Sequence, residues 1–221
     1  MLIPGTFSVP HAPDTPIAIP RRALRIARIY VSQRTTTYNG RLNWNIPKHL
    51  ARFSFSAPPT PAGASPPNDL TIRVFPPGTV DGDSVRPFFE CRLTPWKWVP
   101  AVPFNMRWSP LSLAHVQPPI PLPAGHVRAV EAELAARERG VEIDPYDVSA
   151  KNEVAVAVGT DRWCMFDVGG SVARARGCWV EGMGEGGGEE GYWPKGVGTW
   201  RMGVWCEGAV LEIGVPATWK L

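Results

Sequence analysis

The stretch ALRIARIYVSQ, residues 23–33, decides the fold class of this sequence. It is rich in β-branched and aromatic residues, and its apolar side chains alternate, so it predicts a strand. Residues 35–38 continue the β-like composition after a turn, and Asn39-Gly40 is a strong turn signal. We therefore expect a β-hairpin at this point and a β-rich protein around it.

Working outward, the pattern predicts one clear helix at about 126–139, with strong helix formers and Gly140 as its stop. It predicts Pro-rich loops at 57–69 and 95–123 and a Gly-rich loop at 182–191. The fold class is β-rich α+β, in a single domain over residues 1–221. Further strands are expected at 52–56, 70–75, 86–93, 154–158, 162–168, 171–180, 199–206 and 208–215.

Composition excludes several classes of protein. Hydrophobic residues make up 44% of the chain and charged residues 19%, which argues against intrinsic disorder. The 25 prolines and 22 glycines exclude a mostly helical bundle. No apolar run is long enough to span a membrane, and no secretion signal is recognisable, so we expect a cytoplasmic protein.

Charge and cysteine spacing indicate no nucleic acid, cofactor or metal as a partner. The net charge is +3 and the basic residues are scattered, whereas nucleic-acid binding usually needs a basic face. The four cysteines form no CxxC pair and are expected to be free thiols. The formal GxGxxG that begins at Gly182 cannot open a helix, so no dinucleotide site is expected.

One lysine has an unusual context. In GRLNWNIPKHLARF, residues 40–53, Lys48 is flanked by Ile46, Pro47 and Leu50. A desolvated lysine has a lowered pKa, so that a neutral amine can attack a carbonyl group near neutral pH. This is the chemistry of a Schiff-base lysine, which we expect to point into an apolar cavity. The alternative is a lysine at a strand end whose stem is buried and whose amine reaches water.

These residues resemble the signature of the acetoacetate decarboxylase superfamily, which has Gly-Arg, a short spacer and Pro-Lys-Lys-Leu. Here Gly40-Arg41 is followed by the run Pro47–Leu50. The segments LIPGTFSVP, RIARIYVSQ and SVARARGCWVE are also similar to strands of that family, the last to fungal-type members. The resemblance is good over residues 24–53 and thin elsewhere. It implies a cone-shaped antiparallel β-barrel, or an incomplete one, with helices outside.

The resemblance also implies roles for four residues. Lys48 falls on the Schiff-base lysine, and His49 replaces the second lysine of the family pair. In acetoacetate decarboxylase itself, the lysine is activated by desolvation or by a neighbouring cation. A histidine is cationic for only part of the time near pH 7, so desolvation must contribute more here. Arg41 and Trp44 are expected to bind substrate.

The family's N-terminal arginine and pocket glutamates lie before the strand similar to LIPGTFSVP, and no counterpart precedes it here. An N-terminally short chain with little decarboxylase activity is therefore expected. Two hypotheses stay open. One is a carbon-carbon lyase for a β-keto acid or polyketide-like carbonyl substrate, in secondary metabolism. The other is a small apolar ligand-binding protein of the same fold without turnover. Either could form a homo-oligomer.

Overall fold

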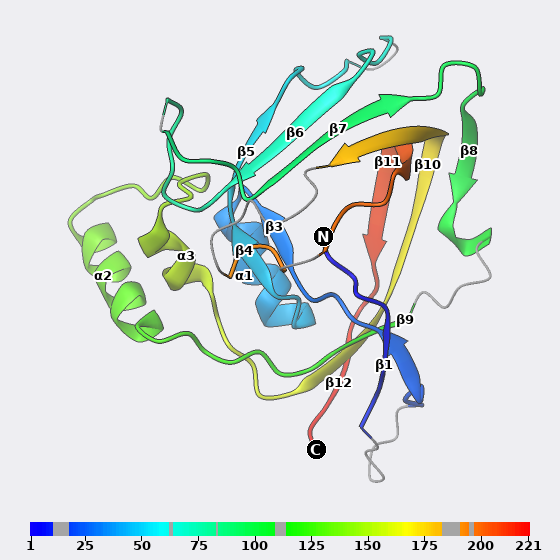
Figure 1. Ribbon diagram of the computed structural model, residues 1–221. Helices are drawn as coiled ribbons and strands as arrows, with labels where there is room; N and C mark the ends of the chain where they lie inside the picture. The colour runs from blue at the N-terminus through cyan, green and yellow to red at the C-terminus, as the bar shows by residue number, and fades with distance from the viewer. Residues whose placement is uncertain (11–17, 62–63, 83, 109–113, 183–190, 195–196) are drawn as a thin grey trace. The chain divides into compact units, whose positions relative to one another are not determined.

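The computed structural model describes two compact units (Figure 1). The first consists of Met1–Leu50, Arg107–Gly169 and Leu211–Leu221, and the second of Ala51–Met106 and Gly170–Val210. The residues described are 1–10, 18–61, 64–82, 84–108, 114–182, 191–194 and 197–221. Among them, no helix combines the length and the apolar character needed to cross a membrane.

The first unit contains short strands around one long strand. β1 (Thr6–Ser8) pairs with β2 (Arg22–Leu24), and β2 runs parallel to β9 (Ala114–Gln117). β9 and β12 (Ala217–Trp219) both pair with the start of β10 (Trp163–Gly182). β3 (Ile29–Val31) and β4 (Lys48–Leu50) form a separate parallel pair. A hydrophobic core cluster lies in this sheet: Ala23, Val116 and Trp219, packed against Phe7, Val9, Ile19, Trp163 and Met165.

The single strand expected at 23–33 is therefore wrong in one respect. It is divided into β2 and β3, because the two halves pair with different partners. Between them, Ile26 is almost fully buried. The alternation of apolar residues was correctly interpreted as extended structure, but local sequence carries no information on which partner each half takes.

Three helices belong to the first unit: α1 (Arg34–Trp44), α2 (His126–Glu138) and α3 (Ala150–Val156). The helix expected at 126–139 is confirmed as α2, and Gly140 follows it with a φ of 78°. Yet α2 buries no residue. Its apolar side chains Val127 and Leu134 are open to solvent, 60% and 53% exposed.

The hairpin expected at 35–40 is wrong, because this segment is the middle of α1. Tertiary contacts outweigh the Asn39-Gly40 turn signal. Thr37, Gly40 and Arg41 are all buried on one side of the helix, and burial of such a face supplies most of a helix's stability.

The strand expected at 154–158 is also wrong. Residues up to Val156 belong to α3, whose buried residues are Asn152, Ala155 and Val156. Ala155 and Val156 lie three and four positions after Asn152, which is the spacing of a helix face. Valine and alanine alternate here, which is the pattern of a strand. Because alanine fits a strand or a helix, the helical spacing is not recognisable from the sequence.

The second unit contains β5 (Arg52–Phe55), β6 (Leu70–Phe75) and β7 (Phe89–Pro95), paired antiparallel in chain order. These confirm the strands expected at 52–56, 70–75 and 86–93. β7, β8 (Val102–Asn105) and β11 (Met202–Ile213) all pair with β10. The strands expected at 162–168 and 171–180 are therefore one strand, β10. Those expected at 199–206 and 208–215 are also one strand, β11.

The predicted loops have three different outcomes. The described part of 57–69 forms no helix or strand, as expected. The loop expected at 95–123 is wrong in part. This Pro-rich segment has extended backbone and forms β8, a 3-10 turn (Met106–Trp108) and β9. Most of the Gly-rich segment 182–191 lies outside the described residues.

Strand pairing joins ten strands through β10 into one mixed sheet. The closed, all-antiparallel barrel that the resemblance implies is not what this pairing forms, because β2 and β9 run parallel. In the path of paired strands given by the described residues, β1 and β5 stand at opposite ends and do not pair with each other. A β-rich α+β protein is confirmed at this coarser level.

Candidate functional site

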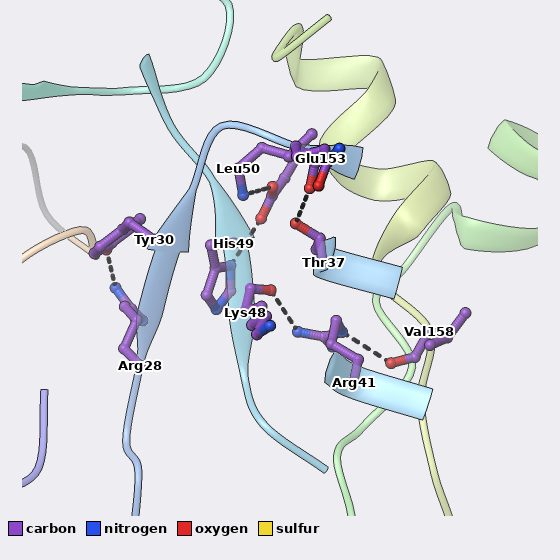
Figure 2. Close-up of polar contacts among 10 residues, drawn as sticks. Arg28, Tyr30, Thr37, Arg41, Lys48, His49, Leu50, Glu153 and Val158 are labelled. Atoms are coloured by element: carbon purple, nitrogen blue, oxygen red, sulfur yellow. Dashed lines mark hydrogen bonds and ion pairs between the residues drawn. The ribbon is translucent and has the colours of Figure 1, made fainter. Parts of the chain in front are cut away.

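Lys48 lies on β4 and packs directly on α1 (Figure 2). A Cβ atom placed on Gly40 would lie 2.5 Å from both Cδ and Cε of Lys48 and 2.9 Å from its Nζ. Only a glycine therefore leaves room for the lysine to lie across the helix backbone in this way. The two halves of the Gly-Arg and Pro-Lys motif meet in space through this contact.

The turn between α1 and β4 brings the lysine back over the helix. Asn45 takes the left-handed conformation, with a φ of 51°, which ends the helix. The N–H of Ile46 then donates to the carbonyl of Gly40 over 3.0 Å. Ile46 and Leu50, the apolar flanks of Lys48 in the sequence, are fully buried.

The Lys48 amine is half-buried and makes no hydrogen bond or ion pair with any residue that the structure describes. Burial lowers the pKa of this amine below its ordinary value. No carboxylate compensates for the lost water, so burial shifts the balance towards the neutral amine compared with an exposed lysine. A neutral amine is the form that attacks a carbonyl carbon.

Arg41 is buried and holds β4 against α1. Its Nη1 donates to the backbone carbonyl of Lys48 over 3.3 Å, and its Nε donates to the carbonyl of Val158 over 2.9 Å (Figure 2). The structure thus turns this predicted substrate-binding guanidinium towards backbone carbonyls. Arg41 positions the strand that carries the lysine.

Trp44, the other residue expected to bind substrate, lies at the end of α1. Its indole N–H donates to the carbonyl of Gly214 over 2.9 Å. This bond ties α1 to the chain just before β12. The indole ring is only partly buried, so its role in the structure is to anchor the helix that supports Lys48.

His49 is held by a carboxylate from α3. Its Nδ1 lies 2.7 Å from Oε1 of Glu153, and the other oxygen of Glu153 accepts the N–H of Leu50. When Glu153 is ionised it only accepts, and Nδ1 of His49 is then the donor in this bond. On its other side the imidazole faces Tyr30, with ring centroids 6.1 Å apart.

This arrangement limits His49 as a substitute for a second lysine. Successive side chains of a strand project to opposite faces, so the imidazole leaves β4 on the face away from Lys48. Any positive charge on His49 is also opposed by Glu153 at hydrogen-bond distance. Desolvation is therefore the cause of the lowered pKa of Lys48.

Sequence reasoning missed Glu153 and the role of Gly40. Glu153 is 104 positions from its partner His49, and the residues directly after it, 154–158, are expected from the sequence to form a strand. A signal was present: Ser149 is a favourable residue to precede a helix, and a glutamate in the first turn complements the helix dipole. Nothing local shows that Gly40 serves for close contact with Lys48.

Three cavities can be described, and Lys48 lines none of them. One of about 360 Å³ lies among α1, α2 and α3. Another of about 440 Å³ lies between α2, α3 and residues 141–147. A third of about 570 Å³ lies along the end of β10 beside residues 198–201. The cavity expected around Lys48 stays a prediction.

Comparison of the chain with protein-family models, with curated proteins and with solved structures finds no match.

Proposed function

We propose that this protein is a Schiff-base lysine lyase of the acetoacetate decarboxylase type. Its substrate is a β-keto acid or a polyketide-like carbonyl compound of the same class. One observation carries the proposal: the Lys48 amine is half-buried, has no partner among the described residues, and has its pKa lowered by burial. Surface lysines are strongly hydrated and normally stay protonated.

The proposed reaction begins when the neutral Lys48 amine attacks the ketone carbon. The carbinolamine that forms loses water and becomes a protonated imine. The bond between the α-carbon and the carboxylate then breaks, carbon dioxide leaves, and the bond's electron pair moves into the iminium to give an enamine. Protonation of the enamine carbon and hydrolysis by water release the ketone and regenerate the amine.

The residues around Lys48 support this proposal by fixing the backbone of the strand that carries the amine. Arg41 bonds the carbonyl of Lys48, and Glu153 bonds the N–H of Leu50 two residues later. β4 is thus held from α1 and from α3. A nucleophile kept in one orientation reacts faster than one that must be ordered during the reaction.

The same proposal includes two further points. The first is that the chain forms an acetoacetate decarboxylase-like domain, and the second is that the protein is cytoplasmic. The β-rich architecture and the Gly40–Lys48 contact support the first. The four cysteines are all free, three of them buried. Free thiols are typical of proteins from reducing compartments and support the second.

The test is release of carbon dioxide from acetoacetate, compared with the spontaneous rate. The wild-type protein should accelerate it, and Lys48→Arg should return it to the spontaneous rate because a guanidinium forms no imine. Lys151→Arg is the matched control, since Lys151 is exposed on α3, and it should keep full activity. Acceleration that survives in Lys48→Arg would overturn the proposal. Ligand binding without acceleration would favour the non-catalytic alternative.

A further inference from the structure

β11 is an edge strand of the second unit. Its residues up to Val210 belong to this unit, and β10 is the one strand that pairs with β11 in the described part of the chain (Figure 1). The edge on the opposite side of this unit is β5, at the end of the path of paired strands. An open edge offers unpaired backbone N–H and C=O groups to any strand that can lie beside it.

Backbone hydrogen bonds decide which residues of β11 face this open edge. The N–H of Val180 in β10 donates to the carbonyl of Arg201 over 2.9 Å. In an antiparallel pair, successive residues direct their backbone groups alternately to one side of the strand and to the other. The outward-facing residues are therefore Met202, Val204 and Cys206. None of the three makes a backbone hydrogen bond on the outer side to another described residue.

This edge lacks the usual protection against pairing with another strand. Met202 and Val204 are 57% and 66% exposed, and Cys206 is exposed too. β11 has 12 residues and contains neither lysine nor proline. β5, in contrast, has only four residues, of which Arg52 is charged. Natural proteins protect sheet edges by short strands, charged residues and prolines, so β11 is the edge that is open to a further strand.

We propose that the edge from Met202 to Cys206 pairs antiparallel with the same edge of a second copy of this chain, which gives a two-fold symmetric dimer. In the register centred on Val204, Met202 lies opposite Cys206 of the second copy, and the outward-facing backbone groups of each copy meet their complements. Arg201 then lies opposite Glu207 of the second copy. Like charges opposite each other destabilise a strand pair, and this register places none along the paired edges.

The size of this interface predicts a weak dimer. The paired stretch is short, so the interface is at the small end of the range for protein complexes, and association should depend on concentration. Assembly should stop at two copies, because a symmetric pair uses the same edge of both. Side chains project from the faces of a sheet, so the Cys206 thiol stays accessible. The inference does not depend on the proposed chemistry of Lys48, which belongs to the first unit.

Sedimentation equilibrium between about 10 µM and about 1 mM tests self-association of the wild-type protein. The apparent mass should rise with concentration from that of one chain towards that of two, and go no further. A mass that stays that of one chain over the whole range would overturn the proposal. Growth beyond two copies would also overturn it, because the symmetric pairing leaves no such edge free.

Variants test the location of the contact. Val204→Lys places two positive charges opposite each other at the two-fold axis and should raise the dissociation constant about tenfold or more. Val204→Thr keeps a β-branched, uncharged side chain and should dimerise like the wild type. Phe55→Lys is the matched control, since it adds the same charge at an exposed residue of β5. It should also dimerise like the wild type, and equal weakening by the two lysine variants would contradict the proposal. Melting curves establish that each variant is folded.

Amide hydrogen exchange followed by NMR tests the same contact without a substitution. The amides of Val204 and Cys206 face outward and should exchange several-fold more slowly in concentrated than in dilute protein. The amides of Gly203 and Trp205 face β10 and should be protected equally at both concentrations. If the mass doubles while exchange at Val204 and Cys206 stays the same, the copies meet elsewhere and the assignment to β11 is wrong.

Discussion

Gly40 and Lys48 are in direct contact although they belong to a helix and a strand, and the missing side chain of the one makes room for the other. A Cβ at position 40 would come within 2.5 Å of Cδ and Cε of Lys48, closer than carbon atoms can approach. The atoms in conflict belong to the far end of a flexible side chain. The lysine would therefore move, and the helix would stay.

Gly40→Ala should consequently change the stability of the protein and the reactivity of Lys48 in different ways. Alanine in place of an interior helical glycine favours the helix by roughly 0.5–1 kcal/mol, so the melting temperature should stay the same or rise. Imine formation at Lys48 should fall because the amine is displaced. The rate of borohydride-trapped adduct formation and a thermal melt measure the two effects.

Asn39→Ala is the control for this substitution. It improves helix propensity at the neighbouring, exposed position of α1. It should raise stability without changing the trapping rate. If both variants trap ligand at the wild-type rate, the Gly40 contact does not position the amine.

The hydrogen bond between His49 and Glu153 predicts a coupled response. His49→Lys places a permanent positive charge next to Lys48 in sequence, so the apparent pKa of imine formation should fall. Glu153 opposes that charge, and the fall should be larger when Glu153→Gln is added. The pH profile of trapping in the single and double variants measures this, and identical profiles would show that desolvation alone controls the amine.

Lys48 should also make stability depend on pH. Burial lowers its pKa below the ordinary value of 10.5. Between the two values the unfolded chain binds more protons than the folded one, so stability rises with pH through that interval. Lys48→Met lacks this titration, and its advantage in stability over the wild type should shrink as the pH rises towards 10.5.

Urea denaturation at several pH values above neutrality measures this difference. Lys151→Met serves as the reference, because it removes the same charge from an exposed site of α3. Its difference from the wild type should stay nearly constant over the same range. A constant difference for Lys48→Met would mean that burial does not affect its protonation.

The cysteines provide a test of the fold that is independent of function. Burial raises the pKa of Cys164 to about 12, in part offset by Arg162, and this thiol is fully buried in β10. Cys206 in β11 is exposed. Since the thiolate is the reactive form, iodoacetamide should alkylate Cys206 first and Cys164 last in the folded protein, as peptide mass spectrometry can follow. Early modification of Cys164 would contradict its position.

The features that could be predicted from the sequence depend on near neighbours. β5, β6 and β7 follow from local alternation between turn residues, and α2 follows from a run of strong helix formers. The burial of the residues that flank Lys48 also follows from their apolar character, because Ile46 and Leu50 are fully buried. In each case the deciding contacts are a few positions apart in the chain.

The features that were missed depend on distant partners. Gly40 looks like a turn residue until Lys48 lies over it, and nothing near Arg41 in the sequence shows that it bonds the carbonyl of Val158, 117 positions away. α3 resembles a strand because valine and alanine alternate in it. Only tertiary packing distinguishes these possibilities, and a single sequence contains no record of that packing.

The central claim is that Lys48 forms an imine with a ketone. The wild-type protein is incubated with acetoacetate, reduced with sodium borohydride, digested and mapped by mass spectrometry. The account predicts a reduced adduct on the peptide that contains Lys48, at a yield well above that on exposed Lys151, and no adduct at position 48 in Lys48→Arg. An unmodified Lys48 peptide, or modification of both lysines to the same extent, would contradict the claim.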